Sequence, residues 1–167
     1  MNTVALAFYT GYAFCQVINV QHVIEEDALM VPFVVHWQGE QPTAIPYPSR
    51  TQEEAVALAK SARENQSPDK TGWSSGRDGL VTLSNGKKHD VLLIEASVPG
   101  LREPVALVYL YRRKPFTLVS GFNWKINLQA RQTEAERKEF MADFQRGLAA
   151  HPFASQCRSY INNATKQ

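Results

Sequence analysis

The sequence lacks the short motifs that identify several common classes of enzyme. It has no GxxxxGK[ST] phosphate loop and no GxGxxG run opening a helix, although glycines and serines are frequent in residues 72–79. The four histidines are far apart in sequence and match no zinc motif, and Glu95-Ala96-Ser97 has serine where a nuclease ExK element needs lysine. We therefore expect no metal and no cofactor, and we favour a protein without catalytic activity.

Cysteine is scarce, and charge is absent from the start of the chain. Cys15 and Cys157 match no metal or redox spacing, so they are either one disulfide or two free thiols. The first 24 residues contain no Asp, Glu, Lys or Arg, but Asn2, Gln16 and Asn19 interrupt the apolar run that a membrane span needs. No basic region or cleavage site of a signal peptide is present. We expect no membrane span and a cytoplasmic location, with a mature exported domain as the alternative.

Positive charge is concentrated in the second half of the chain. Residues 1–83 carry five Lys or Arg against nine Asp or Glu, whereas residues 84–167 carry thirteen against seven. This basic half suits an anionic partner, although scattered surface cations would give the same count. A length of 167 residues fits one domain with a full hydrophobic core. We therefore predict a single domain over residues 1–167.

The first half of the chain is expected to begin with strands. Residues 3–20 fit both a period of two and a helical spacing, and their β-branched and aromatic residues around Thr10-Gly11 favour two strands and a turn. Residues 28–37 indicate another strand, with Pro32 at an edge or bulge, and residues 38–49, with three prolines, indicate a loop.

Two helices have clear start signals. Thr51 with Glu54, and Thr133 with Glu136, each fit the capping box, in which two side chains satisfy backbone N–H groups of the first turn. The apolar face of the first helix is expected at Ala55, Leu58, Ala59 and Ala62, and that of the second at Phe140, Met141, Phe144 and Leu148. Glu134 and Lys138 are spaced to pair on the outside of the second helix.

Residues 79–126 have the pattern of a β-meander. Asn85-Gly86 signals a hairpin, and a two-residue loop there would place Thr82 opposite His89. Residues 105–113 suit a central strand buried on both faces, and residues 116–126 alternate as a strand with one buried face. The predicted fold is α+β, a single domain in which two amphipathic helices pack against an antiparallel sheet.

Two groups of residues are candidates for a functional site. Arg77, Asp78 and His89 form the candidate catalytic set. His89 and the adjacent Asp90 would point to opposite faces of a strand, so we do not expect them to form a catalytic pair. The second group interleaves aromatic residues with cations, as in surfaces that stack single-stranded nucleic acid. Its members are Tyr109, Tyr111, Arg112, Arg113, Lys114, Trp124 and Lys125.

Three hypotheses for function follow from these observations. The first is a non-enzymatic adaptor or regulatory domain that binds another protein. The second is a hydrolase-type enzyme with a dispersed site near Arg77, Asp78 and His89. The third is a nucleic-acid-binding protein that uses the basic aromatic surface, although no RNA-binding signature is present. A protein partner is therefore expected first, with an anionic ligand or nucleic acid as alternatives.

Overall fold

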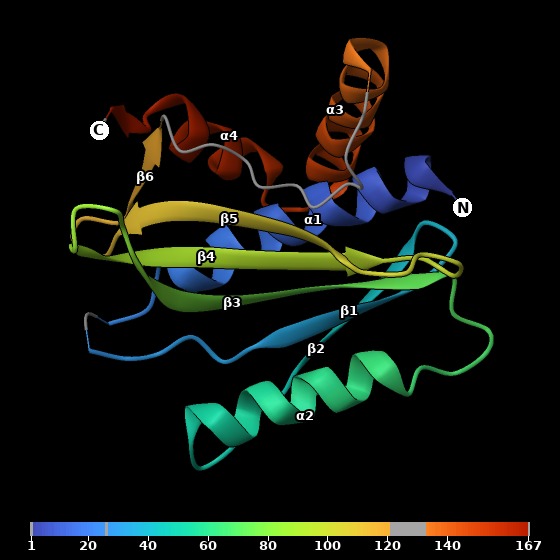
Figure 1. The fold of residues 1–167 in the computed structure, drawn as a ribbon, viewed down its shortest axis with the longest axis horizontal. Helices are drawn as coiled ribbons and strands as arrows, with labels where there is room; N and C mark the ends of the chain where they lie inside the picture. Colours follow the sequence, from blue (N-terminus) through green and yellow to red (C-terminus); the bar gives the residue numbers. More distant parts are fainter. Residues whose placement is uncertain (1, 26, 121–132, 167) are drawn as a thin grey trace.

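The fold is a β-sheet with helices on both faces, seen in a computed structural model that describes residues 2–25, 27–120 and 133–166 (Figure 1). Three helices lie on one face: α1 (Thr3–Gln21), α3 (Glu134–Ala150) and α4 (Ala154–Asn162). Helix α2 (Gln52–Glu64) lies on the other face, against β1 (Phe33–Gln38). The prediction of an α+β domain with helices against an antiparallel sheet is confirmed.

The sheet has the strand order β2-β1-β3-β4-β5-β6-β7. The remaining strands are β2 (Gln41–Pro46), β3 (Gly72–Thr82), β4 (Lys88–Ser97), β5 (Val105–Arg112), β6 (Thr117–Ser120) and β7 (Thr165–Lys166). Neighbours from β2 to β6 pair antiparallel, and the short β7 joins β6 in parallel. The predicted strand over residues 116–126 is seen as β6, and its later part lies outside the described residues.

The prediction of two strands in residues 3–20 is wrong, because this segment is the single helix α1. The Asn2 side chain caps it by accepting a hydrogen bond from the Ala5 N–H at 3.0 Å. The helix packs against β3 and β4 on one side and against α3 on another, so it is apolar nearly all round and has no clear helical stripe. By length and composition α1 could also cross a membrane, but 61% of its apolar window is buried in this fold.

Two glycines allow α1 and α3 to cross at close range. A Cβ added to Gly11 would lie 2.0 Å from the Phe144 carbonyl oxygen, and one added to Gly147 would lie 1.9 Å from the Phe8 oxygen. Any side chain at either position would therefore collide with the backbone of the other helix. Gly11, which the sequence suggested as part of a turn, instead serves this helix contact.

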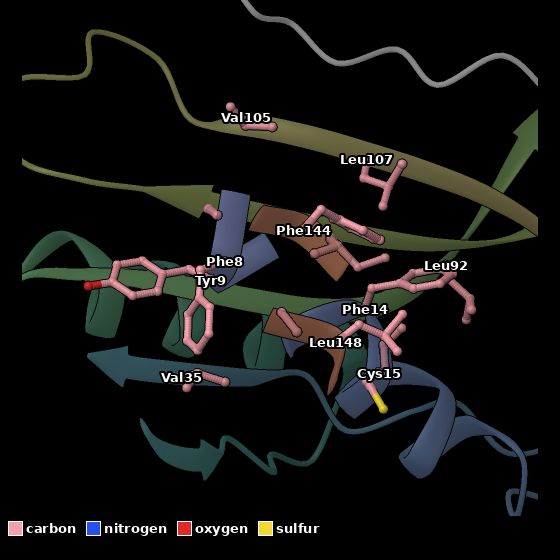
Figure 2. Packing of buried hydrophobic residues seen from close by; sticks show 14 of the residues in the cluster. Phe8, Tyr9, Phe14, Cys15, Val35, Leu92, Val105, Leu107, Phe144 and Leu148 are labelled. Atoms are coloured by element: carbon pink, nitrogen blue, oxygen red, sulfur yellow. The ribbon is translucent and has the colours of Figure 1, made fainter. Parts of the chain in front are cut away.

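The main core lies between the sheet and the three helices. Phe8 and Phe14 of α1 and Phe144 of α3 meet Leu92 and Leu107 of the sheet in one cluster of buried side chains (Figure 2). The α3 stripe of Phe140, Phe144 and Leu148 is buried as predicted. A smaller cluster on the opposite face of the sheet is formed by Val91, Leu110 and Val119, with Val81 and Val108 packed against it. Strand β5 thus contributes to both faces, as its unbroken apolar run predicted.

Strand β2 was predicted as part of a loop, but it forms one edge of the sheet. Its six residues are all exposed, and two of them are Pro42 and Pro46. The Tyr47 N–H donates to the Pro32 carbonyl at 2.9 Å, which continues the β1–β2 ladder. Because bonding direction alternates along a strand, the odd-numbered residues turn their backbone toward β1, and residues 42, 44 and 46 turn theirs outward. The prolines therefore occupy positions where no ladder hydrogen bond is lost.

The β3–β4 hairpin has a register one residue away from the prediction. Thr82 pairs with Lys88 and Val81 with His89, whereas a two-residue loop would pair Thr82 with His89. The Leu83 N–H bonds the Lys87 carbonyl, and Gly86 has a φ of 78°, so three residues make the turn. A glycine in the left-handed region at the third position is typical of such loops. The slip moves His89 to the other face of the strand relative to Thr82.

The starts of α2 and α3 lie where the capping signals at Thr51 and Thr133 predict them. The Thr133–Glu136 capping box is complete, and Glu134 pairs with Lys138 at 3.3 Å. Thr51 accepts a hydrogen bond from the Glu54 N–H, but the Glu54 carboxylate bonds the Ser49 hydroxyl at 2.8 Å. Leu58 was placed on the buried face of α2, but its side chain is 48% exposed. Helix α4, after Pro152, was not predicted.

Candidate binding groove beside helix α2

A groove of about 280 Å³ opens between α2 and the strands next to it. Helix α2 turns only small residues fully inward, Ala55 and Ala59, so it lies close to β1 and leaves space farther along the sheet. Apolar walls come from Pro32, Val56 and Ala59, and polar groups come from Lys60, Arg63, Ser75, Arg77 and Glu95. Ser75 and Glu95 face each other across β3 and β4, and Arg77 lies two residues from Ser75 on the same face.

Arg63 is held at the groove by several contacts. Its Nη1 donates to the Glu95 carboxylate and, at 3.3 Å, to the Ser75 hydroxyl. Its guanidinium also lies over the Trp73 ring, 4.8 Å from the ring centroid. The Arg63 and Glu95 side chains are 19% and 24% exposed, so this ion pair is partly shielded from water. Arg63 and Glu95 therefore form a fixed wall of the groove.

Arg77 differs from Arg63 because no described residue supplies it with a carboxylate partner. Within the described part of the chain its only polar contact is a weak one, from Nη1 to the carbonyl oxygen of the next residue, Asp78, at 3.4 Å. The Arg77 side chain is nevertheless half-buried. Lys60 adds a third cation at the groove, in a loose 3.8 Å pair with Glu64 that is exposed to solvent. Three cations therefore line the groove against one carboxylate, so the groove can accept an anion.

Asp78 lies on the opposite face of the sheet from Arg77, since adjacent residues of a strand point to opposite sides. It is 3% exposed, and its Oδ2 accepts hydrogen bonds from the Met30 N–H and from Arg113 Nη2, both at 3.3 Å. Arg113 Nε also contacts Asp90 Oδ1 at 3.1 Å, and Arg113 Nη1 donates to the Ala28 carbonyl at 2.9 Å. This network ties the α1–β1 connection to β3, β4 and the end of β5, and it engages Asp78 through Oδ2.

The charges in this network are unevenly stabilised. Burial raises the pKa of Asp78, and the Met30 N–H and Arg113 only partly offset that effect. Burial alone would lower the pKa of Arg113, but Tyr111, Asp90 and Asp78 outweigh it and raise that pKa. The difference arises because Arg113 faces two carboxylates and keeps more contact with water than Asp78. Asp78 is therefore a buried carboxylate that depends on Arg113.

His89 shares a face with Arg77, but not a site. It pairs with Val81, four residues beyond Arg77 on β3, which is roughly 13 Å along the strand. Asp78 lies on the other face, so the three predicted catalytic residues do not converge. The segment Gly72-Trp73-Ser74-Ser75-Gly76 also fits the GxSxG pattern of hydrolase nucleophile elbows. It lies within β3 instead of a strand-to-helix turn, and Ser74 is buried and accepts a hydrogen bond from Trp37 Nε1 at 3.0 Å.

The predicted basic aromatic surface is divided between the core and the solvent. Tyr111 is 2% exposed, and Tyr109 packs on Phe14 with their ring centroids 5.5 Å apart, so both rings face the helices. Arg113 is engaged by Asp78 and Asp90, whereas Arg112 and Lys114 are exposed. Trp124 and Lys125 lie outside the described residues. The described part of this surface therefore presents cations without the two tyrosines.

Sequence reasoning named Arg77 only as a catalytic candidate with Asp78 and His89, and it did not name the other polar residues of the groove. Arg63 follows the buried Ala59 by one helical turn, which is the signal that could have placed it beside the sheet. Glu95 and Ser75 meet only through the β3–β4 register, which the sequence does not fix. Among the described residues no three His, Cys, Asp or Glu side chains are placed to hold a metal ion. No protein-family model, curated protein or solved structure matches this chain.

Proposed function

We propose that this protein is a non-enzymatic binding domain, of adaptor or regulatory type, that receives an acidic side chain of a partner protein in the groove beside α2. The observation that supports this most directly is the half-buried Arg77 guanidinium with no carboxylate partner among the described residues. A guanidinium seldom loses water without a compensating anion, because burial of an unpaired charge is costly. A carboxylate from a partner would supply that anion with two parallel hydrogen bonds.

The size and walls of the groove favour a side chain over a larger ligand. At about 280 Å³ it lies near the lower end of the range for small-molecule pockets. Pro32, Val56 and Ala59 offer an apolar wall for the methylene groups of a glutamate, and Arg77, in the same lining, would pair with its carboxylate. Arg63 is already neutralised by Glu95, so Arg77 and Lys60 provide the attraction.

Catalysis and nucleic-acid binding have weaker support. The groove lining contains no histidine, and its one carboxylate, Glu95, is paired with Arg63, so Ser75 has no free base beside it. The nucleic-acid hypothesis needs exposed aromatic rings among the cations, and Tyr109 and Tyr111 belong to the core cluster instead. Binding of a protein partner requires neither feature.

A titration with peptides tests this proposal. The probes are a short capped peptide with one central glutamate and a matched peptide with glutamine, added to ¹⁵N-labelled protein. We expect the glutamate peptide alone to shift the backbone amide signals of Ser75, Arg77 and Glu95, with weak affinity that falls as salt rises. Fluorescence of Trp73, which lies on Arg63, provides a second signal.

Matched variants separate the groove from general positive charge. Arg77→Gln should abolish the shifts, whereas Arg112→Gln, the same charge change at an exposed site on β5, should leave them unchanged. The proposal fails if no acidic peptide shifts groove signals, or if both variants weaken binding equally. Weakening by Arg112→Gln alone would favour the basic surface instead.

A further inference from the structure

The two cysteines, far apart in sequence, lie together where α4 packs on α1. Cys15 belongs to a stripe of α1 with Ile18 and His22, at spacings of three and four residues. Cys157 occupies the matching stripe of α4, between Phe153 and Tyr160. Both cysteines are free and 0% exposed, and both belong to the main core cluster. The Cys15 sulfur is visible at the base of that cluster in Figure 2.

Contacts around the cysteines fix how the two helices face each other. The His22 ring stacks on Phe153 with their centroids 4.9 Å apart and lies 5.9 Å from Tyr160. The side chains that flank Cys157 on α4 therefore both meet the α1 stripe that carries Cys15. Cys157 is also the largest influence on the pKa of the Cys15 thiol, so the two thiols are neighbours where α1 meets α4. The fold thus places the two cysteines on facing stripes of α1 and α4.

We propose that Cys15 and Cys157 form an intramolecular disulfide that joins α1 to α4 when the chain folds in an oxidising compartment. The two thiols lose two protons and two electrons, and one S–S bond forms between Sγ of Cys15 and Sγ of Cys157. The oxidant is a disulfide, either oxidised glutathione or an oxidoreductase of the thioredoxin type, and it leaves as two thiols. The bond would persist outside the reducing cytoplasm, which corresponds to the exported alternative for this chain.

The structure also indicates when this bond must form. The hydrogen bond with Cys157, and then burial, raise the pKa of the Cys15 thiol, so the folded protein holds it protonated and away from oxidants. Reaction therefore requires α4 to leave α1. Helix α4 has only nine residues and no side-chain cap at its start, so it is suited to docking late in folding or opening locally. Oxidation is expected to accompany folding and to be slow in the folded, reduced protein.

Refolding of the full chain tests the proposal. Denatured, reduced protein is refolded in a mixture of oxidised and reduced glutathione, then unfolded and treated with N-ethylmaleimide. We expect the wild type to take up no maleimide, to lose two hydrogen atoms in mass and to give a peptide linking Cys15 to Cys157. Its melting temperature should exceed that of the reduced protein by about 10 °C, because the bond constrains most of the unfolded chain.

Variants and the reduced protein supply the controls. Cys15→Ser and Cys157→Ser should each fail to form an intramolecular bond, and their melting temperatures should not change on oxidation. The folded, reduced wild type should resist maleimide until urea is added. The proposal is overturned if the refolded wild type takes up two maleimides, forms only disulfides between chains, or melts lower when oxidised. These wild-type results decide the question even if a serine variant does not fold.

Discussion

Removal of Arg113 should expose how strongly Asp78 depends on its partner. In Arg113→Met the apolar stem of the side chain is largely kept, but the Asp78 carboxylate loses its cationic partner and keeps the Met30 N–H as a hydrogen-bond donor. Removing one partner of a buried ion pair costs 3–5 kcal/mol, and the 19% exposure of Arg113 favours the lower end, about 3 kcal/mol. With an m-value of about 2 kcal/mol/M in urea, the unfolding midpoint should fall by about 1.5 M at neutral pH.

The pH dependence of this loss has a definite sign. Burial already raises the pKa of Asp78, and loss of Arg113 should raise it further. The folded variant then binds a proton that the unfolded chain releases, so its stability rises as pH falls toward the unfolded value of about 4. The difference between wild type and Arg113→Met should therefore shrink between pH 7 and pH 5.

Urea unfolding followed by circular dichroism measures both effects. Asp78→Asn is the matched control, because it removes the charge but keeps an oxygen for the Met30 N–H and Arg113, and it should cost less than about 1 kcal/mol. The double variant should recover at least half of the loss in Arg113→Met. A loss below 1 kcal/mol at pH 7, or an equal loss at pH 5, would refute the role assigned to Arg113.

Two further predictions concern the helices. Gly11→Ala should destabilise the protein by more than about 3 kcal/mol because the new methyl group meets the α3 backbone, although helix propensity alone would favour alanine by about 1 kcal/mol. The control is Gly100→Ala, where the space is open and the cost should be only about 1 kcal/mol of backbone strain. Thermal or urea unfolding measures both variants, and equal costs would contradict the close crossing of α1 and α3. Burial lowers the pKa of His151 to about 4, and the neutral ring accepts a hydrogen bond from the Phe153 N–H and donates one to Gln16. The contribution of His151 to the free energy of unfolding is therefore complete above about pH 6.5 and is lost as pH falls toward 4. The stability advantage of wild type over His151→Gln should shrink by about 3 kcal/mol across that range, and a constant advantage from pH 7 to 4 would count against this assignment.

The sequence predicted elements whose signals are local. The start of α3 at Thr133 follows from a capping box that acts within four residues, and β5 follows from an apolar run that is buried on both faces. The prediction for residues 3–20 was wrong because α1 has neighbours on two sides, so the segment lacks the polar face that identifies a surface helix. The register of the β3–β4 hairpin changes by one residue when the turn has three residues instead of two. Asn85-Gly86 suits both loops, so the sequence does not decide between the two registers.

The candidate site was harder to predict for a related reason. Arg77 was identified from its place in a polar segment, but its neighbours in the groove come from α2 and β4. Whether these neighbours lie beside Arg77 depends on which face of the sheet Arg77 and the β4 residues occupy. A shift of one residue in the strand register exchanges the two faces. The same shift explains why Asp78 was grouped with His89, from which the sheet separates it.

The prolines of β2 have a consequence for how other molecules can approach this protein. Of the three outward-facing backbone positions, 42, 44 and 46, only Ala44 carries an N–H, so an incoming strand would find a single donor along this edge. The edge therefore resists both aggregation and recruitment of a partner by strand addition. A partner that meets this side of the molecule must instead be recognised through side chains, as the groove beside α2 would allow.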